Sequence, residues 1–333
     1  MTLTSATRKA LITDYAWPDI EAESRILRDA GIEPVPAPDA SPETLARLAA
    51  DVDAIMFCFA QVPGDVLRAA PNCKIAARYG IGVDNLDIPT CTELGIVVTN
   101  VPDYCIDEVA DHVMGFLLAF NRKIVKHNGI VKQSGWKAVQ LTDTMHRLRD
   151  STLGIAGMGR IGRNVASRAR AFGMSVMAFD PFVKQADAPE GVQMADLNEM
   201  LAEADFVTLH APLMPETRGL IGRDELRRMK PDALLINAAR GPLIDEQALV
   251  EALRNDEIGG AALDVLESTS PPDDHPLYAF DNVIITPHTA FFSQASTREL
   301  QTRTAREVIR VLDGGEPEDF INPEVRGKTR VGL

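Results

Sequence analysis

The chain has 333 residues, of which 45% are apolar and 25% charged, and this is the composition of a globular protein. Its formal net charge of −14, with basic residues scattered along the chain, disfavours nucleic acid as a partner. No apolar stretch approaches the roughly 20 residues that cross a bilayer, so we expect no membrane segment. The first residues show no signal peptide, and the four cysteines form no CxxC pair, so we expect free thiols in the cytoplasm.

Short apolar runs alternate with helical patterns along the first hundred residues. We predict helices over residues 20–30 and 42–50, the second with Ser41 as its N-cap. Strands that alternate with helices form parallel sheets, so this part is expected to be an α/β domain. The predicted strands are 9–14, 32–36, 54–59, 75–79 and 96–99.

A second set of strands begins at Thr152, after a long predicted helix over residues 106–121. Another helix, over residues 294–312, follows when this second set is complete. We therefore expect the chain to return to its first domain, so that the second domain is an insertion. The predicted strands of the second set are 153–156, 175–179, 206–209, 233–237, 258–262 and 283–286.

A glycine-rich turn opens directly after the first strand of this second set. Gly157, Gly159 and Gly162 have the spacing of a dinucleotide-binding fingerprint, and a helical pattern over residues 163–172 follows. The first glycine permits a tight turn, the second lets backbone N–H groups approach a pyrophosphate, and the third lets helix and strand pack closely. Asp180 ends the next strand, where a carboxylate binds the ribose hydroxyls and repels a 2′-phosphate. This combination predicts NAD rather than NADP as the cofactor.

Three candidate catalytic residues, His210, Arg240 and His288, follow predicted strands of the second domain. Hydride transfer between NAD and an alcohol carbon requires a base for the hydroxyl proton and a cation for the substrate. An arginine can bind a carboxylate through two hydrogen bonds and polarise a carbonyl. A single histidine or arginine is more often structural, but open α/β sheets bind ligands at the carboxyl ends of strands. The three together therefore favour an active site.

From about residue 50 to 325 the sequence resembles the D-isomer-specific 2-hydroxyacid dehydrogenases. Residues 290–296 look most like the branch that includes the C-terminal-binding protein corepressors and their bacterial enzyme relatives. The segments that carry the family resemblance are 78–85, 100–102, 107–112, 157–162, 209–213, 236–241, 262–265 and 286–288.

The resemblance implies two doubly wound parallel-sheet domains, with a Rossmann cofactor domain inserted into a flavodoxin-like substrate domain. Residues 1–102 and 292–333 would form the substrate domain, and 103–291 the NAD-binding domain. The region 123–149, with Trp136, resembles the arm through which such enzymes form homodimers.

The resemblance also assigns roles to individual residues. Arg240 would bind the carboxylate and carbonyl of a small carboxylate substrate, and His288 would be the general acid/base. The cofactor-binding residues would be Gly157, Gly159, Arg160, Ile161, Gly162, Asp180, His210, Pro212, Ala238 and Asp264, the last facing the nicotinamide carboxamide. The substrate-binding residues would be Tyr79, Gly80, Ile81, Gly82 and Arg240.

The sequence departs from the family pattern at Thr269, where an ungapped comparison expects the glutamate that partners the catalytic histidine. A carboxylate beside an imidazole favours the protonated ring, and threonine supplies no such charge. Our hypothesis is therefore that His288 titrates lower than in members that have the glutamate. Two alternatives stay open: Glu267 could reach the histidine through a shifted loop, or the substrate could carry the missing group.

The sequence thus favours an NAD-dependent oxidoreductase that interconverts a small D-2-hydroxy acid and its 2-oxo acid. The alternative is an NAD(H)-sensing protein of the corepressor type with little activity, which the departure at Thr269 leaves open. A third interpretation, a relative that acts on a one-centre donor such as formate or phosphite, would require local motifs that this sequence lacks. No His, Cys and Asp cluster has the spacing of a metal site.

Overall fold

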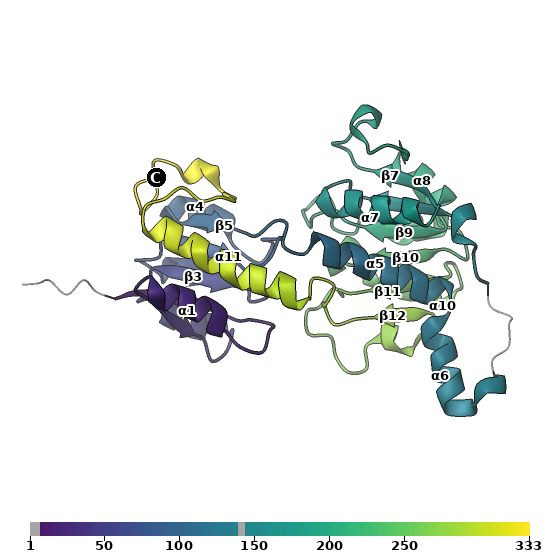
Figure 1. The fold of residues 1–333 in the computed structure, drawn as a ribbon, viewed down its shortest axis with the longest axis horizontal. Coiled ribbons are helices and arrows are strands. Elements are labelled where there is room, and N and C mark those ends of the chain that lie inside the picture. Colours follow the sequence, from purple (N-terminus) through teal and green to yellow (C-terminus); the bar gives the residue numbers. More distant parts are fainter. Residues whose placement is uncertain (1–6, 139–143) are drawn as a thin grey trace, which may run out of the picture. The chain divides into compact units, whose positions relative to one another are not determined.

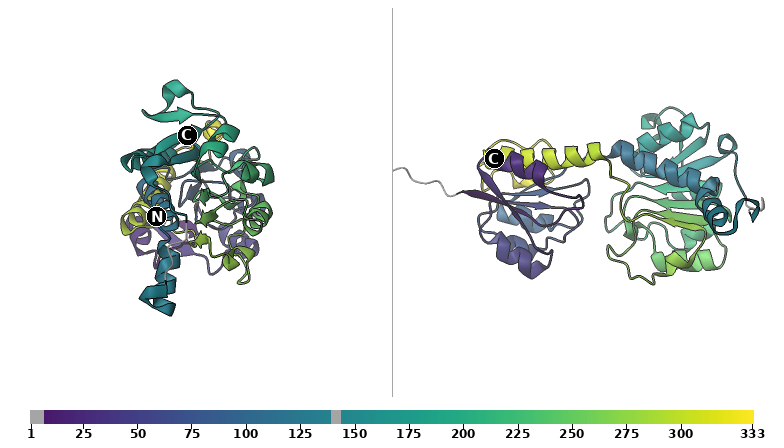
Figure 2. Two further views of the ribbon diagram at one scale, coloured as in Figure 1. Left: turned by 90° about the vertical axis from the view of Figure 1, so that its right-hand side faces the viewer. Right: turned by 60° about the horizontal axis from the view of Figure 1, so that its bottom comes forward.

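The computed structural model describes residues 7–138 and 144–333 (Figure 1). The chain divides into two compact units, Met1–Tyr104 with Ser293–Leu333, and Cys105–Phe292, called unit 1 and unit 2 below. Each unit contains one parallel sheet with helices packed on both of its faces (Figure 2). The α/β class predicted from the alternation of strands and helices is confirmed.

Unit 1 is built on a five-stranded sheet with the strand order β2-β1-β3-β4-β5, which is the flavodoxin-like order. Ser41 caps α2 as predicted, because its hydroxyl accepts a hydrogen bond from the Thr44 N–H at 3.4 Å. The strands are β1 (Arg8–Ile12), β2 (Ile32–Pro36), β3 (Ala54–Phe57), β4 (Ile75–Arg78) and β5 (Val97–Thr99). The helices are α1 (Glu21–Asp29), α2 (Pro42–Ala49), α3 (Gly64–Arg68), α4 (Ile88–Leu94) and α11 (Gln294–Leu312).

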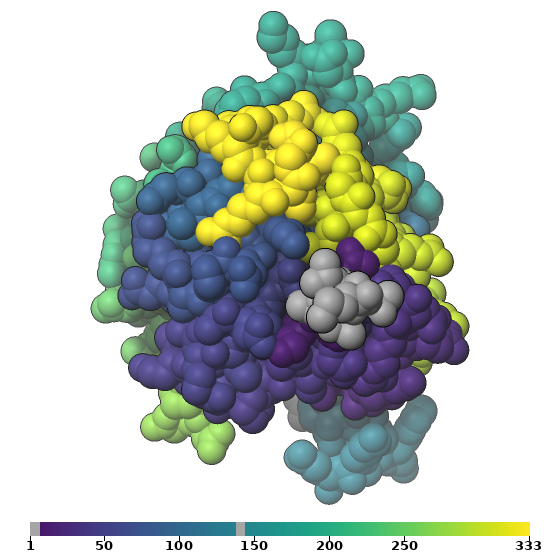
Figure 3. Space-filling view, turned by 90° about the vertical axis from the view of Figure 1, so that its left-hand side faces the viewer, coloured from purple at the N-terminus to yellow at the C-terminus, as the bar shows by residue number. Residues whose placement is uncertain are grey.

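The last forty residues complete unit 1. Helix α11 packs beside α1, and its Gln301 amide donates to the buried carboxylate of Glu23 at 2.6 Å. Beyond the helix, the Ile321 N–H donates to the Val98 carbonyl at 2.9 Å. The Arg330 guanidinium then donates to two carbonyls of the segment between α3 and β4, each at 2.8 Å. Figure 3 shows this C-terminal segment, in yellow, lying against the blue residues of the first part of unit 1.

Unit 2 has a seven-stranded sheet in the order β12-β11-β10-β9-β6-β7-β8, so the strand order reverses between β6 and β9. This is the doubly wound arrangement expected for a Rossmann domain. The strands are β6 (Thr152–Ala156), β7 (Ser175–Phe179), β8 (Val192–Met194), β9 (Phe206–Leu209), β10 (Leu234–Asn237), β11 (Gly260–Leu263) and β12 (Val283–Ile285). The helices are α5 (Ile106–Asn121), α6 (Ile124–Ser134), α7 (Arg160–Ala171), α8 (Leu197–Glu203), α9 (Arg223–Arg228) and α10 (Glu246–Arg254).

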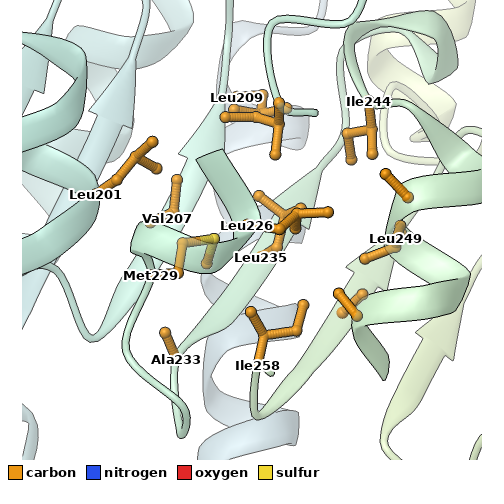
Figure 4. Packing of buried hydrophobic residues seen from close by; sticks show 14 of the residues in the cluster. Leu201, Val207, Leu209, Leu226, Met229, Ala233, Leu235, Ile244, Leu249 and Ile258 are labelled. Atoms are coloured by element: carbon orange, nitrogen blue, oxygen red, sulfur yellow. The ribbon is translucent and has the colours of Figure 1, made fainter. Parts of the chain in front are cut away.

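The core of unit 2 follows from the alternation of side chains along buried strands. In β10, Leu234 and Ile236 pack in the cluster that contains α5 and α7, whereas Leu235 packs in the cluster that contains α8, α9 and α10. Figure 4 shows the second of these layers, where Leu201, Leu226 and Leu249 come from three different helices. Strands that are apolar on both faces hold the sheet between two helical layers, and the strand ends keep fixed positions.

Most predicted elements agree with the structure, and the two long helices 106–121 and 294–312 have the predicted bounds. Strand β8 was not predicted, because an edge strand of three residues gives almost no alternation. The strand predicted at 258–262 instead runs from Gly260 to Leu263, where its residues pair with those of β10 from Leu234 to Asn237. Among the described residues, no helix is long and apolar enough to cross a membrane.

Candidate active site

The glycine turn after β6 has three different environments at its three glycines. Gly157 has a φ of +105°, and a Cβ there would lie 2.7 Å from the His210 carbonyl carbon. A Cβ on Gly162 would collide with the Gly157 carbonyl oxygen, whereas nothing lies within 4 Å of one on Gly159. The turn is therefore tightly packed at Gly157 and Gly162, whereas the space beside Gly159, at the start of α7, is open. The N–H groups of Arg160 and Ile161 begin that helix, where no preceding turn supplies acceptors.

Asp180 follows β7 and faces this turn. One of its carboxylate oxygens accepts from the Met158 N–H at 2.8 Å, and the other from the Phe182 N–H at 2.9 Å. These bonds hold the carboxylate beside the turn while leaving each oxygen a further acceptor site. The turn and Asp180 together fit the pyrophosphate and ribose of a dinucleotide, because open backbone donors and a ribose acceptor lie next to one another.

His210 follows β9 and supports the turn from its other side. Its N–H donates to the Ala156 carbonyl at 2.7 Å, and its Nε2 lies 3.0 Å from the Thr208 hydroxyl. Burial lowers the pKa of His210 to about 4, so the ring is neutral at physiological pH. Its Nδ1 is buried and has no hydrogen-bond partner among the described residues. Pro212 is exposed two residues further on.

Arg240 lies on a loop that the side chain of Asn237 braces. The buried Asn237 amide donates to the Arg240 carbonyl at 2.8 Å and accepts from the Ala239 N–H at 3.0 Å. The guanidinium donates to the Ala239 carbonyl at 2.9 Å and is half-buried, like Ala238. A Cβ on Gly241 would collide with the Leu266 carbonyl, so the chain can turn here only with a glycine. The loop is therefore held rigidly at the end of β10.

His288 lies at the end of β12 in a left-handed backbone conformation, with a φ of +54°. Its N–H donates to the Asp264 carbonyl at 2.8 Å. The Asp264 carboxylate, which is fully buried, accepts from the N–H groups of Thr289 at 2.8 Å and Ala290 at 2.9 Å. The Thr286 hydroxyl donates to the same carboxylate at 2.5 Å. Asp264 thus binds the loop on both sides of His288. Backbone strain of this kind persists only where the surroundings impose it, and it is common at active sites.

The segment that contains Thr269 is exposed, and a hydrogen bond of the main chain at Glu267, two residues earlier, attaches it to helix α10. There, the Glu267 N–H donates to the Glu246 carboxylate at 2.9 Å. The other Glu246 oxygen lies 2.9 Å from Nε2 of the buried His275. Since Nδ1 of His275 accepts from the Leu277 N–H, Nε2 carries the proton and donates to Glu246. The His275–Glu246 pair therefore anchors the loop that contains Thr269.

In unit 1, the predicted substrate-binding segment 79–82 follows β4. The Tyr79 ring is only 1% exposed, and its hydroxyl lies 3.4 Å from Glu23, so only its main chain can meet a ligand. The carbonyls of Gly80 and Ile81 accept from the Val101 N–H at 3.0 Å and the Asn100 amide at 2.7 Å. The N–H groups of Ile81 and of the next residue form no hydrogen bond within the part of the chain that the structure describes.

Sequence reasoning missed His112, Thr286, Glu246 and His275. Each acts through a side chain far along the chain from its partner, such as Thr286, which is 174 residues from His112. The only signal available was that both His112 and Thr286 lie in segments that match the family. Within residues 7–138 and 144–333, no group of three or more His, Cys, Asp or Glu side chains is placed to hold a metal ion.

Comparison with known proteins identifies the family. The model described as D-isomer specific 2-hydroxyacid dehydrogenase, NAD binding domain, matches residues 114–290. A D-3-phosphoglycerate dehydrogenase of Methanocaldococcus jannaschii is 39% identical over 317 residues, which are 94% of this chain and 59% of that protein. The chain thus spans less than two thirds of that relative.

Two further proteins match over most of their length. A glyoxylate reductase of Korarchaeum cryptofilum is 38% identical, over 83% of this chain and 84% of that protein. The structure of Aquifex aeolicus D-lactate dehydrogenase complexed with NAD and lactic acid is 26% identical. It has a TM-score of 0.86, with 94% of this chain and 99% of that chain covered. The chain belongs to the D-isomer-specific 2-hydroxyacid dehydrogenase family.

Proposed function

We propose that this protein is an NAD-dependent oxidoreductase that interconverts a small D-2-hydroxy acid and its 2-oxo acid. The observation that carries the proposal is the clamp of Asp264 on the loop of His288, in the same unit as a complete dinucleotide-binding turn. A histidine held in a strained backbone conformation by a buried carboxylate is the arrangement of a positioned acid/base.

The cofactor is proposed to lie on the turn 157–162, with its pyrophosphate at the start of α7 and its ribose on Asp180. The negative charge of Asp180 supports NAD over NADP. His210 would support the turn as a neutral residue, and Pro212 and Ala238 would line the same strand ends. The chemistry that bound NAD supplies is acceptance of the substrate C2 hydrogen with its electron pair during oxidation, and its return during reduction.

The residues of the chain would move the proton and hold the substrate. In oxidation, His288 takes the hydroxyl proton as the carbonyl forms, and in reduction it returns that proton to the carbonyl oxygen. Arg240 binds the carboxylate and polarises the carbonyl with its planar guanidinium. The N–H groups of Ile81 and Gly82 are proposed as further donors to a substrate carboxylate. Asp264 orders the His288 loop, and since its carboxylate is fully buried, the proposed contact with the nicotinamide carboxamide would use its main-chain atoms.

Thr269 is proposed to lower the pH range in which His288 is protonated, since it brings no charge to the ring. Replacing it by glutamate should move the pH profile of carbonyl reduction upward. An unchanged profile would reject this role and leave Glu267 or a group of the substrate as the partner.

The proposal is tested by following NADH absorbance with a panel of D-2-hydroxy and 2-oxo acids between about pH 5 and pH 10. Turnover that His288→Ala abolishes would support the dehydrogenase. Tight NADH binding without turnover of any acid would reject it and favour an NAD(H)-sensing protein. The relatives described above are named as dehydrogenases or reductases, so we do not propose the sensing function, and the resemblance to the corepressor branch stays a prediction.

Helix α6 is proposed to form a homodimer. It has no buried residue, and Ile124 and Val125 are 54% and 57% exposed, while Trp136 beyond the helix is 85% exposed. Aromatic and aliphatic side chains exposed this far are typical of a surface that another chain covers. Light scattering should show a dimer that Trp136→Ser weakens. Phe182→Ser is the control, since Phe182 is 86% exposed but lies beside Asp180. A monomeric wild type would reject the proposal.

The proposed location is the cytoplasm. All four cysteines are buried free thiols, and burial raises the pKa of Cys58 to about 11 and that of Cys73 to about 12. Such thiols are unreactive and suit a reducing compartment. Fractionation of the source cells with an antibody would test this location, and recovery outside the cytoplasmic fraction would reject it.

A further inference from the structure

A chain of hydrogen bonds runs from helix α5 to the His288 loop. Nε2 of His112, on α5, lies 3.0 Å from the Thr286 hydroxyl oxygen. That hydroxyl donates to the Asp264 carboxylate at 2.5 Å, and the same carboxylate binds the two N–H groups that follow His288. His112 therefore lies at the far end of the network that orders His288.

The direction of each hydrogen bond in this chain follows from the number of protons available. The Thr286 hydroxyl has one proton, and Asp264 as a carboxylate can only accept, so that proton lies between them. The Thr286 oxygen must then accept from His112, which requires the proton on Nε2 of the ring. His112 is thus the terminal donor, and it fixes the orientation in which the hydroxyl faces Asp264.

The surroundings of His112 hold its ring in place. The ring packs edge-on against Phe116, one helical turn away, with centroids 4.5 Å apart. Its side chain is only 22% exposed, and burial lowers its pKa although Asp264 lies 3.8 Å away. A neutral histidine donates through one nitrogen only, so the tautomer that the Thr286 contact requires is well defined.

We propose that His112 is a positioning residue that holds the acid/base His288 in place through Thr286 and Asp264. This inference rests on the proposed function of His288. Removing the donor takes away the bond that fixes the Thr286 oxygen, so that its hydrogen bond to Asp264 weakens and the His288 loop is held less firmly. Most of the contacts proposed for NADH lie at the glycine turn and Asp180, apart from this network, so the affinity for NADH should change less than kcat.

Three substitutions of His112 distinguish the effect of losing its hydrogen bond to Thr286 from the effect of losing the packing of its ring. His112→Gln places an amide N–H the same number of bonds from Cα as Nε2, His112→Asn places one at the position of Nδ1, and His112→Phe keeps only the ring. We expect His112→Gln to retain kcat within about two-fold. His112→Asn and His112→Phe should lower kcat at least about ten-fold, because small displacements of reacting groups are costly. The Kd for NADH should remain within about two-fold in all three.

The matched control is His146→Phe, which removes another partly buried histidine of the same unit, whose Nε2 lies 3.4 Å from Asp232 and whose ring packs edge-on against Phe206. If it lowers unfolding stability as much as His112→Phe but leaves kcat unchanged, the effect of His112 is one of positioning. Equal kcat for His112→Gln and His112→Phe would overturn the proposal, whether both were low or both normal.

A second readout does not need turnover. The imidazole C–H signals of His288, assigned by NMR with His288→Ala, should shift in His112→Phe and return to the wild-type position in His112→Gln. If the wild type turned over no acid, the proposed function would fail, while these signals would still decide whether His112 positions His288. Unchanged His288 signals in His112→Phe would overturn the inference by themselves.

Discussion

Gly162 packs directly against the carbonyl oxygen of Gly157, so the first residues of helix α7 and the turn before it touch through main-chain atoms alone. Any side chain at position 162 must push helix and turn apart. Gly159, three residues earlier, has open space where a Cβ would stand. Packing therefore requires the glycine at position 162, whereas the glycine at position 159 is proposed to leave room for the cofactor.

The pair Gly162→Ala and Gly159→Ala should separate these reasons. Gly162→Ala should lower the free energy of unfolding by roughly 1–3 kcal/mol, as overpacking does. Gly159→Ala should leave stability within about 0.5 kcal/mol but weaken NADH binding at least about ten-fold, because the new methyl occupies the space that the pyrophosphate needs. Chemical denaturation and fluorescence titration with NADH measure the two quantities. Equal effects of both substitutions on stability would contradict the packing argument.

Asp264→Asn should lower both stability and turnover. An amide has one oxygen and a donor group, so it cannot accept all three hydrogen bonds that the carboxylate accepts from residues 286, 289 and 290. We expect a loss of roughly 1–3 kcal/mol in unfolding free energy and a fall in kcat. Asp196→Asn is the control, because Asp196 caps α8 by accepting from the Glu199 N–H at 2.9 Å. A normal kcat in Asp264→Asn would show that the loop holds its position without the carboxylate.

His210 should make the protein less stable in acid. Its pKa is lowered from 6.5 to about 4 by burial, so between these values the unfolded chain binds a proton that the folded chain does not. The resulting stability is fully present above about pH 6.5 and is lost as the pH falls toward 4, by about 3 kcal/mol at most. His210→Gln cannot titrate, so its unfolding free energy should depend less on pH in this window. Parallel curves for the two proteins would contradict the prediction.

If the proposed function holds, an unphosphorylated 2-oxo acid should be a better substrate than a phosphorylated one. The loops that follow the five strands of unit 1, all within its described part, contain six aspartates but no Lys, Arg or His. Arg78, at the end of β4, donates to the carbonyls of Gly82 at 2.8 Å and Phe57 at 3.2 Å. Its guanidinium is buried, so it offers little to a phosphate, which prefers charged donors. We expect kcat/KM to differ at least about ten-fold.

A charge-adding variant provides the control for that comparison. Phe59 is half-buried on the loop after β3, where its N–H donates to Asp14 at 2.6 Å. Phe59→Arg should raise kcat/KM for the phosphorylated acid relative to the unphosphorylated one. A wild type that prefers the phosphorylated acid would show that its phosphate meets a cation elsewhere.

The sequence predicted best those parts of the candidate site that are formed by residues close together in the chain. The glycine turn, Asp180 and the strand ends that carry Arg240 and His288 were all predicted from residues within a few positions of each other. The direction of the Tyr79 ring and the partners of Asp264 depend instead on which distant segments meet. Asp264 binds residues 22 to 26 positions away, and His112 lies 174 positions from Thr286. Such pairs leave no periodic pattern, so only the folded structure reveals them.

Unit 1 is made of two stretches of sequence that lie on either side of unit 2, and this affects the order in which the two units can fold during synthesis. Unit 2 is continuous, from Cys105 to Phe292, and can fold as soon as it leaves the ribosome. The first hundred residues emerge earlier but must wait for α11, whose Gln301 binds Glu23 over 278 positions of sequence. In that interval α1 lacks its partner helix, and the carboxylate of Glu23 lacks the Gln301 amide. Synthesis of unit 1 thus starts before that of unit 2 and ends after it.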